Sequence, residues 1–384
     1  MLKKFSIENF KNFRKSICID FEKIAGYQFS TDCISNNLIS KMVIYGRNAT
    51  GKTNLGIALM NIYDTLSGRS RFVREGVFLN ADATEDWATF SYTFQFDDKE
   101  LVYQYARFSD FELRSEELII DGNIIFNCNF VNKQFNLDGL KYVDAETANV
   151  ERYLQALNEG KEIDGEIEPK LPFLRWLISN IALESDSILI KLYNYVERMA
   201  MITANNSIIY FSGMYNGSFY KSLEKSENLQ DFEDFLNEMG IECKLELKKL
   251  PDGQRQLYFA HEKLVPFFES ASSGTLALVQ LYRRIVSIAR EKSLLYLDEF
   301  DAFYHYEMAK NVVQYFKKKY PKCQLIMTSH NTSLMTNRLM RPDCLFILSS
   351  EGTLTALCDA TERELREGHN LAKMYVSGEF EKYE

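Results

Sequence analysis

The spacing of apolar and polar positions changes several times along the chain. Residues 1–21 alternate between apolar and polar side chains on either side of a basic turn at 11–15, which predicts two antiparallel strands. After a polar stretch, residues 42–45 form a continuous apolar run that ends at Gly46, a pattern typical of a strand buried on both faces of a sheet. Residues 53–66 then carry apolar side chains at helical spacing. The sequence therefore predicts strand, loop and helix in succession.

The middle of the chain has two kinds of pattern. Residues 87–143 are aromatic and alternating, and the turn-like tips Asp97-Asp98 and 121–123 divide them into the hairpins of an antiparallel meander. From 146 to 240 the spacing becomes helical, with a helix expected over 188–201. Alternation then returns up to residue 268, which predicts a short group of strands after the helices.

The last third of the chain alternates between helical and strand patterns. The expected order is helix 275–291, strand 293–299, helix 306–319, strand 323–329, helix 332–339, strand 344–348 and strand 353–358. Such alternation indicates an α/β fold with a largely parallel sheet. We interpret the chain as a core made of 1–145 and 269–384, with a helical lobe inserted at 146–268.

Composition narrows the class of protein. Of the 384 residues, 46% are hydrophobic and 26% are charged, which is typical of a folded globular protein. No stretch approaches about 18 uninterrupted apolar residues, and the first residues lack a signal-peptide pattern, so we expect a cytoplasmic protein without a membrane anchor. The seven cysteines are far apart and the four histidines lack metal-ligand spacing, which argues against a disulfide framework or a transition-metal site. The net charge of −9 gives no support to nucleic-acid binding.

The strongest chemical signal is the sequence between the buried strand and the helix that follows it. It matches G-x-x-x-x-G-K-[ST] in the strand-loop-helix context that this phosphate-binding loop requires. Its backbone N–H groups are expected to surround phosphates, with Lys52 on the β and γ phosphates and the Thr53 hydroxyl on Mg²⁺. The alternative is a chance glycine-rich turn. The candidate nucleotide-binding residues are Gly46, Arg47, Asn48, Ala49, Thr50, Gly51, Lys52, Thr53 and the adjacent Asn54.

A second signal is the apolar run 294–297, which ends in Asp298 and Glu299. Side chains at the carboxyl end of a strand lie near the nucleotide crevice of an open α/β sheet. Asp298 is therefore a candidate Mg²⁺ residue, and Glu299 is a candidate general base for the attacking water. The alternative is an acidic strand end without a catalytic role.

Two weaker signals come from the same third of the chain. Ser272, Ser273, Gly274 and Thr275 open an expected helix, so their hydroxyl and N–H groups can form a second anion site, or simply a helix cap. His330 follows the buried strand 323–329, where its imidazole can hydrogen-bond a γ-phosphate or the attacking water, or have a purely structural role.

Taken in order, these residues resemble the ABC class of ATPases, in the branch that contains RecF, SMC and OLD proteins. In that comparison Gly46–Thr53 corresponds to Walker A, Ser272–Thr275 to the signature, Leu294–Glu299 to Walker B and His330 to the switch histidine. The opening Phe5–Phe13 is similar to the "I-x-N-F-K-x-F" start of the branch. The resemblance implies a P-loop NTPase fold of the ABC type, with a mixed sheet core, an antiparallel β subdomain and an inserted helical lobe.

The chain also resembles the compact AAA-type ATP-binding proteins of bacterial anti-phage operons such as Septu and PARIS. Their S-x-G-T, D-E-x-D-x-x-x-H and T-x-H-N patterns correspond here to 272–275, 298–305 and 328–331. Tyr306 departs from the proline that is frequent in this group. A Q-loop glutamine is not assigned, since Gln95 and Gln104 both lie in the aromatic meander.

This resemblance implies ATP and Mg²⁺ as cofactors and a homodimer or larger oligomer that closes on ATP, each signature completing the site of the other copy. It also implies a partner effector, a nuclease or toxin, because no TOPRIM nuclease segment follows the ATPase motifs. Two alternatives remain. One is a RecF/SMC-like ATPase that binds DNA through basic residues such as Lys248, Lys249 and Arg255, and the other is a scaffold that binds ATP with little hydrolysis.

Overall fold

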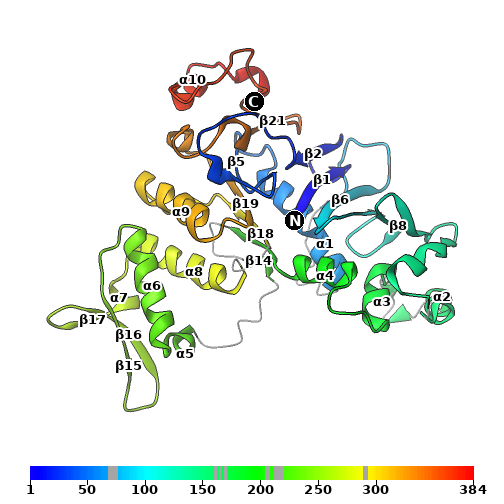
Figure 1. Cartoon of the computed structure of the whole chain (residues 1–384), viewed down its shortest axis with the longest axis horizontal. Helices are drawn as coiled ribbons and strands as arrows, with labels where there is room; N and C mark the ends of the chain where they lie inside the picture. Colours follow the sequence, from blue (N-terminus) through cyan, green and yellow to red (C-terminus); the bar gives the residue numbers. More distant parts are fainter. Residues whose placement is uncertain are drawn as a thin grey trace.

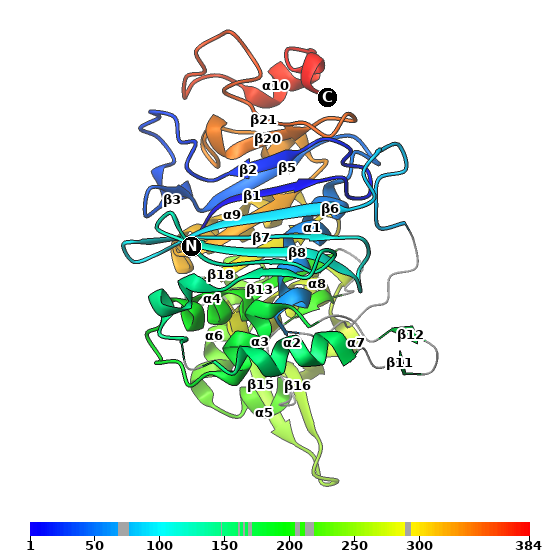
Figure 2. The same cartoon turned by 90° about the vertical axis from the view of Figure 1, so that its right-hand side faces the viewer.

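The computed structural model describes residues 1–67, 77–146, 148–159, 162–163, 166–167, 171–203, 208–211, 219–288 and 293–384. Two large sheets dominate this part of the chain, and helix α1 (Lys52–Ser67) lies between them (Figures 1 and 2). Helices α8 (Ser273–Ile288) and α9 (Tyr306–Lys319) lie on the opposite side of the second sheet (Figure 1). The core is therefore layered as sheet, helix, sheet and helix.

The sheet that carries the candidate site is mixed. Its five central strands, β13, β18, β19, β5 and β20, are parallel, and an antiparallel strand closes each edge. The order across the sheet is β14 (Ile208–Phe211), β13 (Met199–Thr203), β18 (Ser293–Asp298), β19 (Cys323–Thr328), β5 (Lys41–Tyr45), β20 (Leu345–Leu348) and β21 (Leu354–Ala356). Strands β5, β18, β19 and β20 are buried along their whole length, because layers cover both faces.

The other large sheet is antiparallel, as the alternating aromatic pattern predicts. Its order is β10 (Gln134–Asn136), β9 (Asn123–Asn129), β8 (Leu113–Ile120), β7 (Lys99–Arg107), β6 (Ala88–Phe96), β1 (Leu2–Glu8) and β2 (Ile17–Asp20). Asp97 and Asp121 adopt positive φ angles of 54° and 48° at the expected hairpin turns. Side chains of β6 alternate between buried and partly exposed, so only one face of that strand lies in the core.

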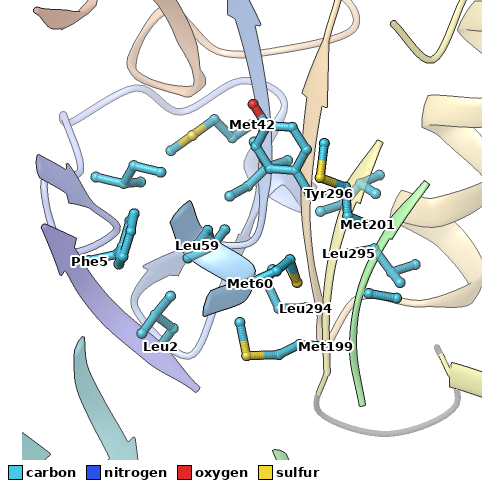
Figure 3. Close-up of a cluster of buried hydrophobic side chains, with 14 of the residues drawn as sticks. Leu2, Phe5, Met42, Leu59, Met60, Met199, Met201, Leu294, Leu295 and Tyr296 are labelled. Atoms are coloured by element: carbon cyan, nitrogen blue, oxygen red, sulfur yellow. The ribbon is translucent and has the colours of Figure 1, made fainter. Parts of the chain in front are cut away.

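Helix α1 fills the space between the sheets. Leu59 and Met60 of this helix lie among Leu2 and Phe5 on one side and Tyr296 on the other (Figure 3). Each such large side chain contributes about 1.5–3 kcal/mol when it is fully buried. The hydroxyl of Tyr92 also donates to the carbonyl of Ala58 at 3.0 Å, which ties α1 to the antiparallel sheet.

A buried glutamine joins the two sheets at one end. Gln324 of β19 donates its amide to the carbonyl of Leu2 at 2.8 Å and accepts from the N–H of Leu2 at 2.9 Å. Tyr195 donates to the same glutamine at 2.6 Å. The first strand is therefore fixed to the mixed sheet by polar contacts that satisfy every group involved.

The segment 146–268, expected to be an inserted lobe, is divided in the structure. Strands β13 and β14 belong to the core sheet, which corrects the expectation of a single helix over 188–201: α4 ends at Glu197 and a strand follows. The remainder forms α2 (Val150–Glu159), α3 (Phe173–Asn180), α4 (Ile188–Glu197), α5 (Phe219–Leu223), α6 (Ser226–Glu238), α7 (Phe267–Ser270) and strands β11 (Glu162–Ile163), β12 (Glu166–Ile167), β15 (Leu245–Lys249), β16 (Arg255–Ala260) and β17 (Leu264–Pro266). Figure 1 shows α5 to α7 with β15 to β17 as a separate lobe beside α8.

Helix α3 begins on a buried carboxylate of the antiparallel sheet. Glu116 of β8 accepts from the N–H groups of Phe173 at 2.6 Å and Leu174 at 2.9 Å, and from the Tyr103 hydroxyl at 2.8 Å. These contacts satisfy N–H groups that have no partner within the helix. Burial nevertheless raises the pKa of Glu116 to about 7, because it disfavours the charged form more than the three donors favour it.

One helix expected near the end of the chain is absent. Residues 332–339 contain only a 3₁₀ turn at Thr332–Leu334, which begins where the Asn331 side chain accepts from the N–H of Ser333 at 3.0 Å. Such side-chain contacts favour turns over longer helices. The remaining short elements are β3 (Ile34–Ser35), β4 (Leu38–Ile39) and α10 (Leu371–Val376).

Candidate functional site

The candidate site lies at the carboxyl ends of β5, β18 and β19. Strand β5 ends at Tyr45, the loop 46–51 follows, and α1 begins at Lys52. A Cβ at Gly46 would lie 2.6 Å from the carbonyl oxygen of Leu348, so only glycine lets the loop pass β20 this closely. Ala49 adopts a positive φ of 64°, which turns the exposed tip of the loop back toward the helix. Asn48 is also exposed on this tip.

The side chain of Lys52 folds back onto the loop 46–51. The ammonium of Lys52 donates to the carbonyl oxygens of Gly46 at 2.8 Å and Arg47 at 3.0 Å. Burial lowers its pKa, and the negative charges of Asp298 and Glu299 oppose that shift. Carbonyl oxygens are neutral acceptors, so the charge of Lys52 remains available to an anion that enters the loop.

A chain of hydroxyl and carboxylate groups joins the loop to the neighbouring strands. Thr53 donates to one oxygen of Asp298 at 2.7 Å, and Thr328 donates to the other at 2.8 Å. The side chains of Thr53 and Asp298 come from residues 245 positions apart. They supply oxygen ligands of the kind that Mg²⁺ prefers, so both residues fit the metal role expected of them.

Glu299 lies directly after β18 in a strained conformation. Its φ is 49°, in the left-handed region that non-glycine residues rarely adopt, and its N–H donates to the Thr328 hydroxyl at 2.7 Å. The strain turns the chain sharply after Asp298, so that the two neighbouring acids have different surroundings. Asp298 is buried, whereas the Glu299 side chain is 51% exposed. An exposed carboxylate beside a buried one suits a group that meets substrate water.

His330 faces this carboxylate from the end of β19. Its Nε2 lies 3.8 Å from an oxygen of Glu299. Partial burial lowers the pKa of His330, the charge of Lys52 lowers it further, and the nearby carboxylates raise it. The imidazole is therefore neutral at pH 7, a form that can donate one hydrogen bond and accept another. The structure thus brings together Lys52, Thr53, Asp298, Glu299 and His330.

The segment 272–275 is placed elsewhere. The Ser272 hydroxyl accepts from the N–H of Thr275 at 3.1 Å and contacts its hydroxyl at 2.8 Å, so it caps the start of α8. A Cβ at Gly274 would lie 3.1 Å from the carbonyl oxygen of Phe303, in the loop that follows Glu299. Within the described residues, the hydrogen bonds of Ser272 stay in its own turn and do not reach the loop 46–51. Ser273 is exposed beside them.

Helix α8 and the strand that carries the acids face each other across a small cavity. It has a volume of about 40 Å³, and its lining includes Ala277 and Leu281 of α8, Asp298 of β18 and Phe303.

Two residues that the sequence analysis did not assign belong to the site. Asn12, in the turn between β1 and β2, donates to the carbonyl of Thr50 at 2.8 Å and accepts from the Asn54 amide at 2.8 Å. Thr328 connects Asp298 with the backbone of Glu299. Both lie inside segments quoted for their family resemblance, Phe5–Phe13 and 328–331. That resemblance is the only sequence signal that could have identified them.

A partly buried acid, Asp301, supports the turn that carries His330. Asp301 accepts from the Ser329 hydroxyl at 2.8 Å, and the same hydroxyl accepts from the N–H of Asn331 at 2.9 Å. Burial raises the pKa of Asp301, whereas the hydrogen bond from Ser329 lowers it. These contacts fix the loops after β18 and β19 to each other.

None of the helices in the described ranges is both long enough and apolar enough to cross a membrane.

Comparison with known proteins gives one family match and several structural likenesses. Residues 159–336, less than half of the chain, match the family described as "AAA domain, putative AbiEii toxin, Type IV TA system". This segment contains Asp298, Glu299 and His330 but not the loop 46–51. No curated protein matches the sequence.

The solved structures that are similar to this chain include three SMC heads. An SMC head bound to the C-winged helix domain of ScpA has a TM-score of 0.46 and 15% identity, over 90% of this chain and 93% of that chain. The SMC head domain from Thermotoga maritima has a TM-score of 0.42 and 13% identity, over 92% and 98%. An Smc head domain with an extended coiled coil, bound to the C-terminal domain of ScpA derived from Pyrococcus furiosus, has a TM-score of 0.47 and 14% identity, over 93% and 96%. The chain thus combines a phosphate-binding loop with a segment similar to an AAA domain.

Proposed function

We propose that this chain is an ATPase that binds Mg-ATP at Gly46–Asn54 and hydrolyses it with Glu299 as general base. Backbone N–H groups of the loop and Lys52 hold the phosphates, and Thr53 with Asp298 holds Mg²⁺, which neutralises phosphate charge when bound. Glu299 takes a proton from the attacking water. His330 orients that water or the γ-phosphate through its neutral imidazole.

The observation that carries this proposal is the 2.7 Å hydrogen bond between Thr53 and Asp298. It joins the end of the phosphate loop to the acidic strand, so the two halves of a nucleotide site lie at one edge of the sheet. His330 and Glu299, whose side chains lie 3.8 Å apart, are the groups that act on the attacking water. Any one of these features alone has a structural explanation, but their convergence favours phosphate chemistry.

We further propose that ATP joins two copies of the chain and that this change regulates an effector protein, a nuclease or toxin of an anti-phage system. The exposed Ser272 forms its hydrogen bonds within its own turn and not with the loop of its own chain, which leaves it available to a second copy. The exposed Phe303 and Tyr306 lie after Glu299 and offer apolar surface for such a contact. The family description, which names a toxin system, supports an effector. In this scheme 1–145 and 269–384 form the ATPase core, with β13 and β14 contributed by 146–268.

The test is the solution mass of the Glu299→Gln variant with and without Mg-ATP, together with phosphate release by the wild-type protein. We expect the variant to bind ATP, lose turnover and shift to a dimer or larger species. Lys52→Ala should show neither binding nor the shift, and Glu307→Gln, which alters an exposed acid on α9, should behave as wild type. Unchanged hydrolysis in Glu299→Gln would remove this residue from the general-base role. Tight binding by wild type without turnover would favour the scaffold alternative.

Several basic residues of the DNA-binding alternative have acidic neighbours, which does not favour it. Arg255 pairs with Glu224, Lys248 lies 3.4 Å from Glu246, and the lysines at the end of α9 also have acidic partners. Such pairing reduces the positive charge available to phosphates of a nucleic acid. Binding to duplex DNA that strengthened steeply as salt was lowered would restore this alternative.

A further inference from the structure

The last residue of the sequence contacts the phosphate loop. One side-chain oxygen of Glu384 accepts a hydrogen bond from Nε of Arg47 at 2.9 Å and lies 2.8 Å from a terminal nitrogen of the same guanidinium in an ion pair. Arg47 is the residue after Gly46, and its carbonyl accepts from Lys52. The Glu384 side chain is only 11% exposed, whereas that of Arg47 is 66% exposed. The contact places a negative charge directly beside the phosphate loop.

Other contacts place the end of the chain at this position. The N–H of Ser350, just beyond β20, donates to the carbonyl of Glu384 at 3.3 Å. The ring of Tyr375 in α10 lies 6.5 Å from that of Tyr45, the last residue of β5, and burial and the nearby Glu384 raise the pKa of the Tyr375 hydroxyl. Figure 1 shows the C-terminus beside β21, at the edge of the mixed sheet. The segment 371–384 therefore packs onto the strand that leads into the phosphate loop.

We propose that this segment is a nucleotide-responsive latch, held closed by Glu384 on Arg47 and released when phosphates enter the loop. The proposal rests on the proposed nucleotide binding and adds a form of regulation to the same site. Arg47 presents one planar group of donors, which can match a carboxylate or a phosphate but not both in the same geometry. A nucleotide brings several negative charges to the loop, and these repel the Glu384 carboxylate while they attract Arg47.

The energy of the closed contact suits a reversible latch. Arg47 is largely exposed, so water screens the pair and its net contribution is small. A charge-assisted bond from Arg47 to a phosphate can replace it, and loss of the Glu384 contact loosens the end of the segment 371–384, while Leu371 and Phe380 stay in the core. The state of the nucleotide would thus be transmitted to 371–384, a surface far in sequence from the segment 272–275.

The first test compares the affinity of wild type and Glu384→Gln for a fluorescent ATP analogue in the presence of Mg²⁺. Removing the negative charge should tighten binding by about threefold or more at low salt, and the difference should shrink as salt is raised. The matched control is Glu381→Gln, which neutralises an exposed carboxylate three residues earlier and should leave the affinity unchanged. Equal affinity of Glu384→Gln and wild type would overturn the latch.

The second test measures backbone hydrogen exchange of 371–384 in the wild-type protein. We expect faster exchange when Mg-ATP is bound, and in Glu384→Gln already without nucleotide. Nucleotide binding that leaves the exchange of this segment unchanged would also overturn the latch. If neither protein binds nucleotide at all, the proposed function itself fails and the latch with it, an outcome distinct from equal binding by both.

Discussion

The side-chain amide of Asn12 occupies the space that a Cβ at Gly51 would require, at a distance of 2.0 Å from its nitrogen. The same amide group bonds Thr50 and Asn54 on either side of Gly51. The turn between β1 and β2 therefore forms one wall of the phosphate loop. Position 51 requires glycine for two reasons. The contact with Asn12 leaves no room for a Cβ, and the φ of 100° is one that residues with a side chain rarely adopt.

Gly51→Ala should disrupt this wall. The new methyl group displaces Asn12 and forces a strained backbone angle, so we expect a loss of about 1–3 kcal/mol in the free energy of unfolding and loss of nucleotide binding. Urea denaturation and titration with a fluorescent nucleotide measure the two effects. Gly26→Ala is the matched control, because a Cβ there would meet nothing within 4 Å. Wild-type affinity in Gly51→Ala would show that Asn12 does not limit the shape of the loop.

The Thr53 hydroxyl should set the requirement for Mg²⁺. Thr53→Ala removes the oxygen that bonds Asp298, and we expect half-maximal ATPase activity to need at least about tenfold more Mg²⁺. Thr53→Ser keeps the hydroxyl on Cβ, so its Mg²⁺ requirement should remain close to that of wild type. Steady-state rates over a series of Mg²⁺ concentrations give the comparison. The same Mg²⁺ dependence in both variants would exclude a ligand role for this hydroxyl.

Protonation of His330 should limit activity at low pH. Because burial and Lys52 lower its pKa below the ordinary value of about 6.5, the neutral form persists to lower pH than in a free histidine. We expect kcat/KM of the wild-type enzyme to fall only below that pH. His330→Gln should be about 10²-fold slower and should lack this ionisation. If kcat/KM of the variant fell at the same low pH as that of wild type, the ionisation would belong to another group.

Glu116 should make the fold less stable as pH rises from about 5 to 7. Its pKa is raised to about 7 in the folded protein, so the native state holds a proton that the unfolded chain has already lost. Stability should therefore fall with increasing pH over this window, by up to about 1.4 kcal/mol per pH unit. Glu116→Gln cannot ionise at this position, so its free energy of unfolding should lack this decrease with pH.

Chemical denaturation at several pH values between 5 and 8 measures this effect. Glu116→Gln should also be about 1–3 kcal/mol less stable than wild type at pH 5, because one N–H of α3 loses its acceptor. Glu117→Gln is the control, since Glu117 bonds Asn127 on the exposed face of the sheet. Parallel pH curves for wild type and Glu116→Gln would contradict the assignment.

The sequence contains enough information to predict the fold class. The expected α/β core with a mixed sheet and an antiparallel β subdomain is confirmed by the strand order. Continuous apolar runs identify β5, β18 and β19, because strands buried on both faces are apolar at most positions. The motif at Gly46–Thr53 has fixed spacing, so its place between a strand and a helix is also predictable.

Contacts between distant segments were beyond the reach of pattern analysis. Strand β13 follows α4 without a glycine or proline, and its residues Met199–Thr203 continue the apolar helical spacing, so a helix was expected there. The contacts of Asn12 with Thr50 and of Glu384 with Arg47 link parts of the chain that no local period connects. Only the folded topology brings these groups together.

The position of β5 has a consequence for how the protein is made. Its neighbours in the sheet are β19 on one side and β20 on the other, and both are encoded after residue 322. A ribosome that adds about 5–20 residues per second therefore leaves β5 without either neighbour for roughly 15 to 55 seconds. During that time a mostly apolar strand has two open hydrogen-bonding edges, a state prone to aggregation. Nascent chains should consequently depend on chaperones until the last sixth of the protein has emerged.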